Sequence, residues 1–295
     1  MSKRTILLML DPDGQSSVFD RVVAVDAGAE VLFAHSGVKT SEVQALVHGC
    51  IFTRAPKDLN RTAVFVGGSN VEQAEAILRE VHQSMIPQFG LQVSTMLDAN
   101  GCNTTAAAAV RKAAMHLPLN GKKALVLGGT GPVGSRAALL LAREGAQVLL
   151  GSRSKAKAES VAASIDRTCL KDDQGKPVVP LEISSEEEIT RHVPGCSLVI
   201  SAGAAGIRFT SISRLSGIKD LQVLIDLNGV PPMGIEGIEL GDCAKERSGL
   251  TCYGALGVGG FKIKLHRACL ASLFERNNAR LEAAEIYDLA KSLEG

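Results

Sequence analysis

Residues 122–153 read KKALVLGGTGPVGSRAALLLAREGAQVLLGSR, and this stretch predicts the fold of the chain around it. The apolar run at 123–128 has the pattern of a buried parallel strand, and a second run follows at 147–150. Between them, Gly129, Gly131 and Gly134 have the spacing G-x-G-x-x-G and lead into the helical run 135–144. A strand, glycine turn, helix and strand within about 30 residues form the fingerprint of a dinucleotide-binding unit.

Each glycine of this turn has a predicted task. Gly129 allows a tight turn, Gly131 lets the backbone approach a pyrophosphate, and Gly134 lets helix and strand pack closely. The start of the helix adds free N–H groups and the positive end of the helix dipole. A glycine-rich turn without a ligand is the alternative, but the strand before it and the helix after it favour the dinucleotide.

The sequence after the second strand indicates which dinucleotide binds. A carboxylate there would bond the ribose 2′-OH of NAD, yet residues 151–157 read GSRSKAK, with three cations and no acid. An arginine can hold a phosphate through two parallel hydrogen bonds. We therefore expect NADP as the cofactor, with Arg153 on its 2′-phosphate. The alternative is that these cations are only the solvated start of the next helix.

Composition excludes several classes of protein. The chain has 295 residues, 45% of them hydrophobic and 21% charged, which predicts a globular protein of two domains. A net charge of +1 does not suggest a nucleic-acid partner. The seven cysteines are scattered and never in C-x-x-C spacing, which argues against disulfides and against a metal site. No run approaches the roughly 18 apolar residues of a membrane span, so we expect a cytoplasmic protein.

The chain divides into two predicted α/β domains. Residues 1–117 alternate strands (5–10, 31–34, 63–66 and 93–97) with helices, a three-layer unit without fingerprint glycines that should bind the substrate. The segment 117–121, LPLNG, is the predicted linker. Residues 118–261 should form a Rossmann-type doubly wound parallel sheet that binds NADP. Helices predicted at 262–276 and 282–293 should complete the first domain, so that it spans 1–117 and 262–295.

Two further strands of the nucleotide domain end in small or polar residues. The strand at 198–201 is followed by Ala202 and Gly203, and the strand at 223–226 by Leu227 and Asn228. Ligands of open α/β sheets bind in the crevice beyond such strand ends. The predicted NADP contacts are Gly129, Thr130, Gly131, Pro132, Val133, Gly134, Ser152, Arg153, Lys157, Ser201, Ala202, Gly203 and Asn228.

Several motifs in this order carry a resemblance to a known family. They are SVFD at 17–20, DANGCNTT at 98–105, GTGPVG at 129–134, GSR at 151–153 and GALGVGGFKIKLHR at 254–267. Together they resemble the bacterial NADP-dependent methylene-tetrahydromethanopterin dehydrogenases, over essentially the whole chain. The glycine fingerprint is shared by many dehydrogenases, whereas the threonine-rich and lysine-containing segments are more specific. The polar turn at 171–176 is longer than the family pattern.

The resemblance implies a fold and an activity. The family has a Rossmann-type NADP domain and a second α/β domain, with the pterin bound in the cleft between them. Its members form homo-oligomers and oxidise methylene-tetrahydromethanopterin to the methenyl form by direct hydride transfer in one-carbon metabolism. Some also accept methylene-tetrahydrofolate. The expected partner is therefore a pterin one-carbon carrier.

The resemblance also implies catalytic residues. Lys262 matches the family's catalytic lysine, and its alternative is an exposed lysine in the first turn of a helix. Asp20 is its expected partner, but Ser17 and Asp20 also have the spacing of a capping box, in which Asp20 would bond the Ser17 N–H. The product cation is stabilised by the two pterin nitrogens, so the reaction needs no obligatory base and depends on positioning and electrostatics.

The remaining candidates lie around the threonine-rich segment. Asp98 ends a predicted strand, where α/β sheets place chemistry, although a turn residue is the alternative. Thr105 is expected to present its hydroxyl to the pterin. The predicted substrate contacts are Phe19, Asn103 and Thr104, with a plain helix cap as the alternative for Asn103. We expect His266, four residues after Lys262, to be a packed or surface histidine.

Two other functions remain open from the sequence. The first is a methylene-tetrahydrofolate dehydrogenase, with or without cyclohydrolase activity, because contacts to the tail of the carrier cannot be identified. The second is a non-catalytic NADPH sensor, which would keep Arg153 but would not need Lys262, Asp98 and Thr105 together.

Overall fold

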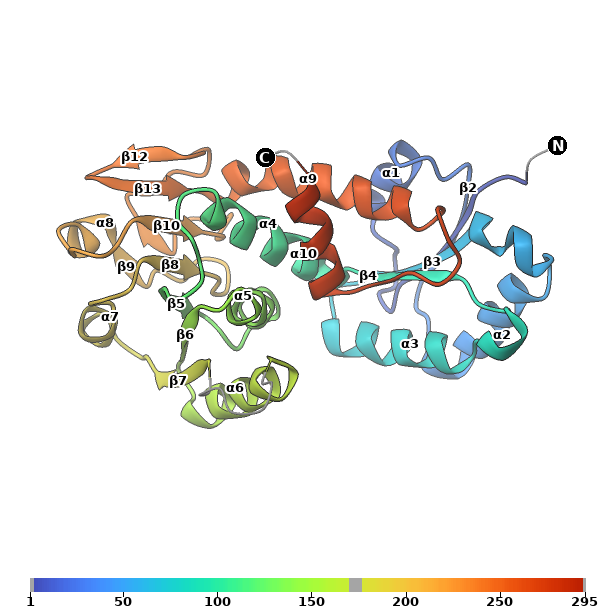
Figure 1. Cartoon of the computed structure of the whole chain (residues 1–295), viewed down its shortest axis with the longest axis horizontal. Helices are drawn as coiled ribbons and strands as arrows, with labels where there is room; N and C mark the ends of the chain where they lie inside the picture. Colours follow the sequence, from blue (N-terminus) through green and yellow to red (C-terminus); the bar gives the residue numbers. More distant parts are fainter. Residues whose placement is uncertain (1–2, 170–176, 294–295) are drawn as a thin grey trace. The chain divides into compact units, whose positions relative to one another are not determined.

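The computed structural model describes residues 3–169 and 177–293, and the chain forms two compact units (Figure 1). Unit 1 contains Met1–Thr104 and Ile263–Leu293, and unit 2 contains Thr105–Lys262. The chain passes between the units inside two helices, α4 (Cys102–Ala114) and α9 (Ala255–Ser272). The first crossing therefore lies within α4, before the predicted linker at 117–121. The predicted polar turn at 171–176 lies outside the described residues.

Unit 1 is built on a five-stranded parallel sheet. Its strands are β1 (Ile6–Leu10), β2 (Val31–His35), β3 (Thr62–Val66), β4 (Ser94–Leu97) and β14 (Arg280–Leu281). Their order is β2-β1-β3-β4-β14, so the strand that completes the sheet comes from the last part of the chain. This is the doubly wound order 2-1-3-4-5, in which the chain direction across the sheet reverses between β1 and β3.

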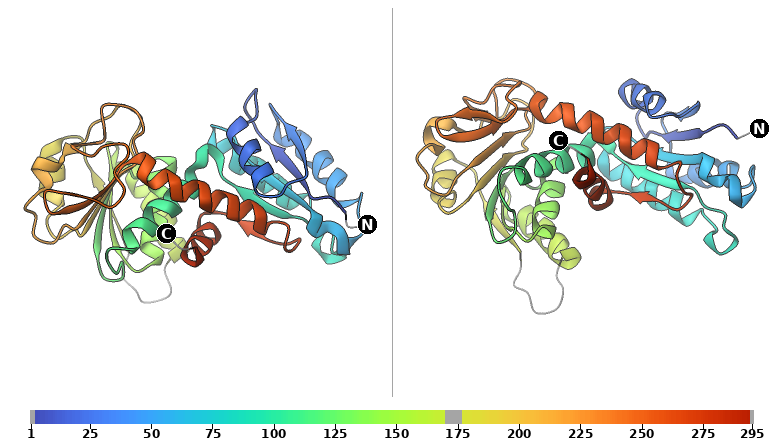
Figure 2. Two further views of the ribbon diagram at one scale, coloured as in Figure 1. Left: turned by 90° about the horizontal axis from the view of Figure 1, so that it is seen from above. Right: turned by 45° about the horizontal axis from the view of Figure 1, so that its top comes forward.

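Helices cover both faces of this sheet. Helices α1 (Val18–Asp26) and α9 lie on one face, and α2 (Thr40–Ile51) and α3 (Val71–Gln83) lie on the other (Figures 1 and 2). The α2 and α3 side holds a core in which Leu8, Leu10, Val64 and Val66 of the strands pack with apolar side chains of both helices. Helix α10 (Ala283–Ser292) follows β14.

Unit 2 contains a seven-stranded sheet. Its strands are β5 (Lys123–Leu127), β6 (Gln147–Ser152), β7 (Val178–Glu182), β8 (Leu198–Ser201), β10 (Val223–Asp226), β12 (Lys245–Arg247) and β13 (Leu250–Tyr253). Their order is β7-β6-β5-β8-β10-β13-β12, and only the edge strand β12 is antiparallel. Without β12, this is the Rossmann order 3-2-1-4-5-6, which reverses between β5 and β8. The predicted fold class is confirmed.

The helices of unit 2 also cover both faces. Helices α5 (Pro132–Arg143) and α6 (Lys155–Cys169) lie on one face, and α7 (Glu186–His192) and α8 (Ile212–Leu215) on the other (Figure 1). Strands β9 (Thr210–Ser211) and β11 (Ile235–Glu236) form a separate parallel pair. No helix among residues 3–169 and 177–293 is long and apolar enough to cross a membrane.

The predicted start of the helix at residue 262 is wrong, because α9 already begins at Ala255. The glycine cluster at 254–260 therefore belongs to the helix and the residue before it. A Cβ at Gly254 would collide with the Glu239 carbonyl oxygen, and one at Gly257 with that of Asp242. These glycines let the 239–242 segment approach the helix backbone. Lys262 consequently lies in the third helical turn and is partly buried, so the alternative of an exposed lysine in the first turn is wrong.

Candidate functional site

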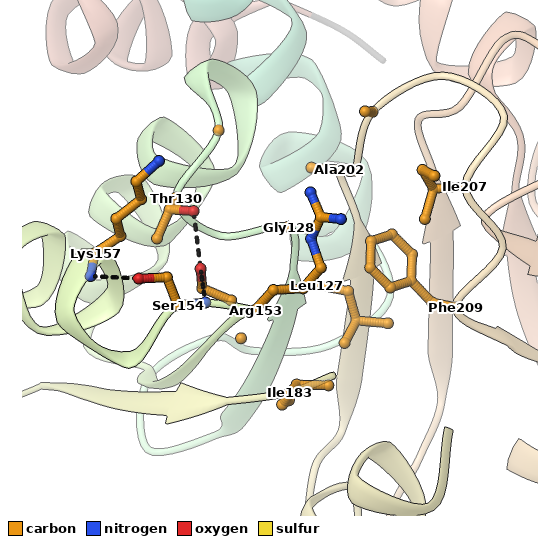
Figure 3. A pocket seen from close by; sticks show the side chains of 15 residues that line it. Leu127, Gly128, Thr130, Arg153, Ser154, Lys157, Ile183, Ala202, Ile207 and Phe209 are labelled. Carbon is orange, nitrogen blue, oxygen red and sulfur yellow. Dashed lines mark hydrogen bonds between the residues drawn. The ribbon is translucent and has the colours of Figure 1, made fainter. Parts of the chain in front are cut away.

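A pocket lies in unit 2 where the strand order of the sheet reverses, between β5 and β8 (Figure 3). It has a volume of about 270 Å³, and its walls come from the ends of β5 and β6 and from the segments that follow β5, β6, β7 and β8. This is the crevice in which doubly wound sheets bind nucleotides. The pocket is defined entirely by residues of unit 2.

The glycines of the fingerprint divide their tasks differently from the prediction. The tight turn is made by Gly128, with φ +69°, and not by Gly129. A Cβ at Gly128 would lie 2.7 Å from the Gly203 Cα, and one at Gly129 would lie 2.6 Å from Leu150 Cδ1. Gly134 has its predicted task, because its Cβ would collide with the Gly128 carbonyl oxygen. At Gly131 a Cβ would lie 3.3 Å from the same oxygen, so the fit is tight without a collision.

Hydroxyl groups and cations line the end of the pocket after β6. The Ser152 hydroxyl lies 3.1 Å from that of Thr130 and accepts a hydrogen bond from the Ser154 N–H at 3.2 Å. The Lys157 N–H donates to the Ser154 hydroxyl at 3.4 Å, at the start of α6. Arg153 and Lys157 are exposed. Two exposed cations beside hydrogen-bonded hydroxyls suit a phosphate monoester.

An apolar wall faces this charged end. Ile207 and Phe209 come from the segment after β8 and lie across the pocket from the β6–α6 turn (Figure 3). A Cβ at Gly203 would collide with the Phe209 ring, so glycine is what allows the ring to lie there. A pocket with one charged end, one apolar wall and a glycine turn fits the phosphates and the base of NADP.

The predicted cofactor residues fall into two groups. Those that line the pocket are Thr130, Gly131, Ser152, Arg153, Lys157, Ala202 and Gly203. Those that do not are Gly129, Pro132, Val133, Gly134, Ser201 and Asn228. The sequence missed Leu127, Gly128, Gly151, Ser154, Ile183, Ala204, Ile207 and Phe209, which also line it.

Asn228 stabilises its own loop. Its side-chain amide donates to the Pro232 carbonyl at 2.8 Å, and its side-chain oxygen accepts from the Val230 N–H at 3.0 Å. Asp226 supports the same loop by accepting from the N–H groups of Asn228 and Ile235. Burial raises the pKa of Asp226 in spite of these hydrogen bonds.

A second cluster of polar residues lies at the carboxyl edge of the sheet in unit 1. Asp11 follows β1, Gly67 follows β3 and Asp98 follows β4, so they surround the point at which this sheet reverses. A Cβ built on Gly67 would lie 3.7 Å from Asp20 Oδ2 and 3.8 Å from Asp11 Oδ2. The carboxylates of Asp11 and Asp20 therefore flank Gly67. Burial raises the pKa of Asp11.

The structure shows which residue completes the cap of the helix that contains Asp20. The Ser17 hydroxyl accepts a hydrogen bond from the Asp20 N–H at 3.2 Å, so Ser17 is the cap of α1. The Ser17 N–H, however, donates to Asp11 Oδ2 at 3.2 Å. Asp11 thus takes the place that Asp20 would have in a capping box. Asp20 Oδ1 instead lies 3.9 Å from Nδ1 of His266.

Asp98 is more than a turn residue. Its Oδ1 accepts from the N–H groups of Asn103 (2.9 Å) and Thr104 (3.0 Å), and its Oδ2 accepts from the Thr104 hydroxyl at 2.5 Å. Asp98 thereby satisfies N–H groups at the start of α4. The alternative of Asn103 as a plain cap is wrong, because Asn103 lies inside α4 and its amide donates to the Leu97 carbonyl.

His266 is the residue whose setting the sequence did not indicate. Of the two expectations, a packed or a surface histidine, the packed one is correct. Its ring nitrogen Nδ1, however, lies 3.9 Å from both Asp20 Oδ1 and Asp98 Oδ2. Its ring stacks on Phe65 of β3, with centroids 5.7 Å apart. The only sequence signal was its position one helical turn after Lys262. Its carboxylate neighbours lie far away in the chain.

The other candidates are more exposed. Phe19 on α1 is half-exposed, with its ring centroid 6.2 Å from that of His266. Lys262 and Thr105 are partly buried. Each is the residue of unit 2 next to a boundary with unit 1, Thr105 within α4 and Lys262 within α9. Within the described part of the chain, no group of three or more His, Cys, Asp or Glu side chains is placed to hold a metal ion.

Solved structures share this fold. A shikimate 5-dehydrogenase from Listeria monocytogenes matches with a TM-score of 0.55 and 15% identity, over 98% of this chain and 96% of that one. A quinate dehydrogenase from Corynebacterium glutamicum, in complex with NAD, matches with a TM-score of 0.52 and 15% identity, over 99% and 100% of the two chains. At these identities the likeness shows the fold alone.

Sequence relatives give the family. The model of the N-terminal domain of methylene-tetrahydromethanopterin dehydrogenase matches residues 18–100. Two proteins of Methylorubrum extorquens match nearly end to end. "Bifunctional protein MdtA" is 41% identical over 99% of this chain and 100% of its own length. "NAD(P)-dependent methylenetetrahydromethanopterin dehydrogenase" is 32% identical over 99% of both. With such identity over its whole length, the chain belongs to the methylene-tetrahydromethanopterin dehydrogenase family.

Proposed function

We propose that this protein oxidises methylene-tetrahydromethanopterin to methenyl-tetrahydromethanopterin and transfers the hydride to NADP. The observation that carries the proposal is the glycine-lined pocket of unit 2, whose lining includes Arg153 and Lys157, in a chain whose full-length relative is named for this reaction. No observation favours a cyclohydrolase or a non-catalytic sensor.

The pocket of unit 2 is the proposed NADP site. The turn at Gly128 and Gly131 would hold the pyrophosphate against the start of α5, where N–H groups are free to donate. Arg153 and Lys157 would bind the 2′-phosphate, together with the hydroxyls of Ser152 and Ser154. When bound, NADP supplies the nicotinamide carbon that accepts the hydride.

The carboxyl edge of the sheet in unit 1 is the proposed pterin side. Loss of the hydride leaves positive charge on the carrier, and a carboxylate that is already in place stabilises such charge as it grows. Asp20 is the proposed catalytic carboxylate, while Asp98 fixes the start of α4 through its hydrogen bonds to Asn103 and Thr104. Phe19, Asn103 and Thr104 are the proposed substrate contacts.

Lys262 and Thr105 are the remaining proposed catalytic residues. A free cation beside a growing cation would repel it. We therefore propose that the Lys262 amine is neutral, or paired to a carboxylate, or bonded to a polar group of the pterin. The Thr105 hydroxyl is proposed to bond the pterin.

The test is the absorbance of NADPH at 340 nm. Purified protein is mixed with NADP and methylene-tetrahydromethanopterin, and in parallel with methylene-tetrahydrofolate or with NAD. We expect a rise with the methanopterin carrier and NADP. Reduction of NADP with the folate carrier alone would favour the folate dehydrogenase. No reduction with either carrier, from a protein that still binds NADPH, would favour the sensor.

We also propose a cytoplasmic homo-oligomer. The support for the compartment is that all seven cysteines are free thiols, and the support for self-association is the family resemblance. Light scattering of the purified protein measures its mass, and the mass of a single chain would contradict the oligomer.

A further inference from the structure

His266 is held rigidly inside unit 1. Its side chain is fully buried. The ring stacks on Phe65 with an angle of 27° between the planes, and the Phe19 ring lies nearby at 36°. Close-packed aromatic neighbours leave an imidazole little freedom to rotate. The position of its Nδ1 atom is therefore fixed by packing.

Two carboxylates from separate parts of the chain lie at the same distance from this atom. Asp20 Oδ1 and Asp98 Oδ2 are each 3.9 Å from His266 Nδ1. This distance is too long for a direct hydrogen bond, but a protonated imidazole at this position would attract both carboxylates. Without the imidazole between them, the two carboxylates would repel each other.

The two carboxylates differ in how they are held. The side chain of Asp98 is fully buried, and its oxygens accept the three hydrogen bonds from Asn103 and Thr104. The side chain of Asp20 is 14% exposed, so it is the member of the group that reaches the surface. Asp98 is thus the fixed anchor, and Asp20 is the carboxylate that a bound molecule can approach.

We propose that His266 is a positioning residue that holds the Asp20 carboxylate in place, with Asp98 as its anchor. This inference rests on the proposed function, in which Asp20 stabilises the positive charge that grows on the pterin. A shift of about 1 Å in such a group can cost on the order of 100-fold in rate. His266 acts on the reaction through Asp20 and does not itself touch the carrier.

Three substitutions at one position test this. His266→Asn keeps an amide at the place of Nδ1, His266→Gln moves the amide to the place of Nε2, and His266→Leu keeps bulk without a polar atom. We expect kcat for methylene-tetrahydromethanopterin oxidation to fall on the order of 100-fold in His266→Leu. His266→Gln should resemble it, and His266→Asn should lie closer to the wild type. NADPH affinity, measured by calorimetry, should stay unchanged in all three.

A double-mutant cycle separates positioning from packing. If His266 acts through Asp20, then Asp20→Asn combined with His266→Leu should be about as slow as Asp20→Asn alone. His82→Leu is the matched control. It removes another histidine of unit 1, which bonds Thr95, and it should lower the melting temperature without changing kcat.

The outcomes distinguish this inference from the proposed function. A wild-type protein that does not reduce NADP with the methanopterin carrier would overturn the proposed function. With an active wild type, independent and multiplying effects of the two substitutions would overturn the positioning role. So would equal kcat values in His266→Asn and His266→Gln. If His266→Leu does not fold, the cycle is made with His266→Gln.

Discussion

At the carboxyl edge of the seven-stranded sheet the candidate site is made of backbone, glycine and exposed cations, whereas at that of the five-stranded sheet it is made of carboxylates and a buried histidine. Both sheets are doubly wound, and both sites lie where the direction of the sheet reverses. The first is encoded mainly in one short segment of sequence. The second joins Asp20, Asp98 and His266 from three distant segments. One site is suited to hold phosphates, and the other is suited to stabilise a growing positive charge.

The largest effect is expected from Lys262→Met, a side-chain substitution that should slow the chemical step and leave nucleotide binding unchanged. Lys262 is the proposed catalytic lysine of α9, so kcat and kcat/KM should fall together, on the order of 100-fold or more. NADPH affinity and melting temperature should stay near the wild type. Lys264→Met removes an exposed lysine of the same helix and is the control. Near-normal turnover in Lys262→Met would remove this residue from the catalytic set.

The next effect concerns the charged end of the nucleotide pocket. Arg153→Ala should weaken NADP binding about thirtyfold, because a charge-assisted hydrogen bond to phosphate contributes on the order of 2 kcal/mol. NAD, which lacks the 2′-phosphate, should lose little. Lys155→Ala is the matched control, since Lys155 is exposed nearby but does not line the pocket. Equal losses for NADP and NAD would mean that Arg153 only supports the fold.

A smaller effect separates two glycines of the same turn. Gly131→Ala should raise KM for NADP several-fold, because the methyl group would lie against the path of the pyrophosphate. Its stability should change little, because the Cβ would lie 3.3 Å from the Gly128 oxygen without a collision. In Gly134→Ala the Cβ would also lie 2.9 Å from the Gly129 Cα, so a backbone shift must follow. That variant should lose on the order of 1–3 kcal/mol of stability. Thermal unfolding and steady-state kinetics measure both, and a reversed pattern would exchange the two roles.

The smallest effect is a pH dependence that should have the same sign at both sheets. Burial raises the folded-state pKa of Asp11 and of Asp226 above the unfolded value. A carboxyl with a raised pKa contributes stability at low pH that is lost as the pH rises through its folded-state pKa. The melting temperature of Asp226→Asn minus that of the wild type should therefore be higher at pH 8 than at pH 4. Asp11→Asn should do the same, and a difference independent of pH would contradict the prediction.

The sequence predicted what depends on local patterns. The strands of both sheets follow from their apolar runs, and the glycine spacing predicts the turn after β5. Asp98 was found because it follows a strand. What failed depends on the approach of distant segments. The prediction places the glycines at 254 and 257 before a helix that begins at residue 262, because nothing local shows that carbonyls of residues 239 and 242 pack against them.

The cluster of Asp20, Asp98 and His266 could not be predicted for the same reason. The Ser17 and Asp20 spacing predicts a capping box, but the structure gives the place of Asp20 to Asp11, a residue of the preceding loop. The setting of His266 requires α9 to pack on β3 and α1 at the same time. Periodicity shows that a residue faces a core, but not which charged groups meet it there.

The order of the chain has a consequence for its synthesis. The described residues of unit 2 all lie between Thr105 and Lys262, but unit 1 takes its edge strand β14 from residues 280–281, which pair with Thr95 and Met96. The Ser94 hydroxyl donates to the carbonyl of Arg276 and accepts from the N–H of Ala279, so the strand-end contacts also wait for that segment. On the ribosome, the nucleotide unit can close as soon as its own residues emerge. Unit 1, which is made first, must wait until residues 280–281 leave the exit tunnel, and until then β4 is an open sheet edge.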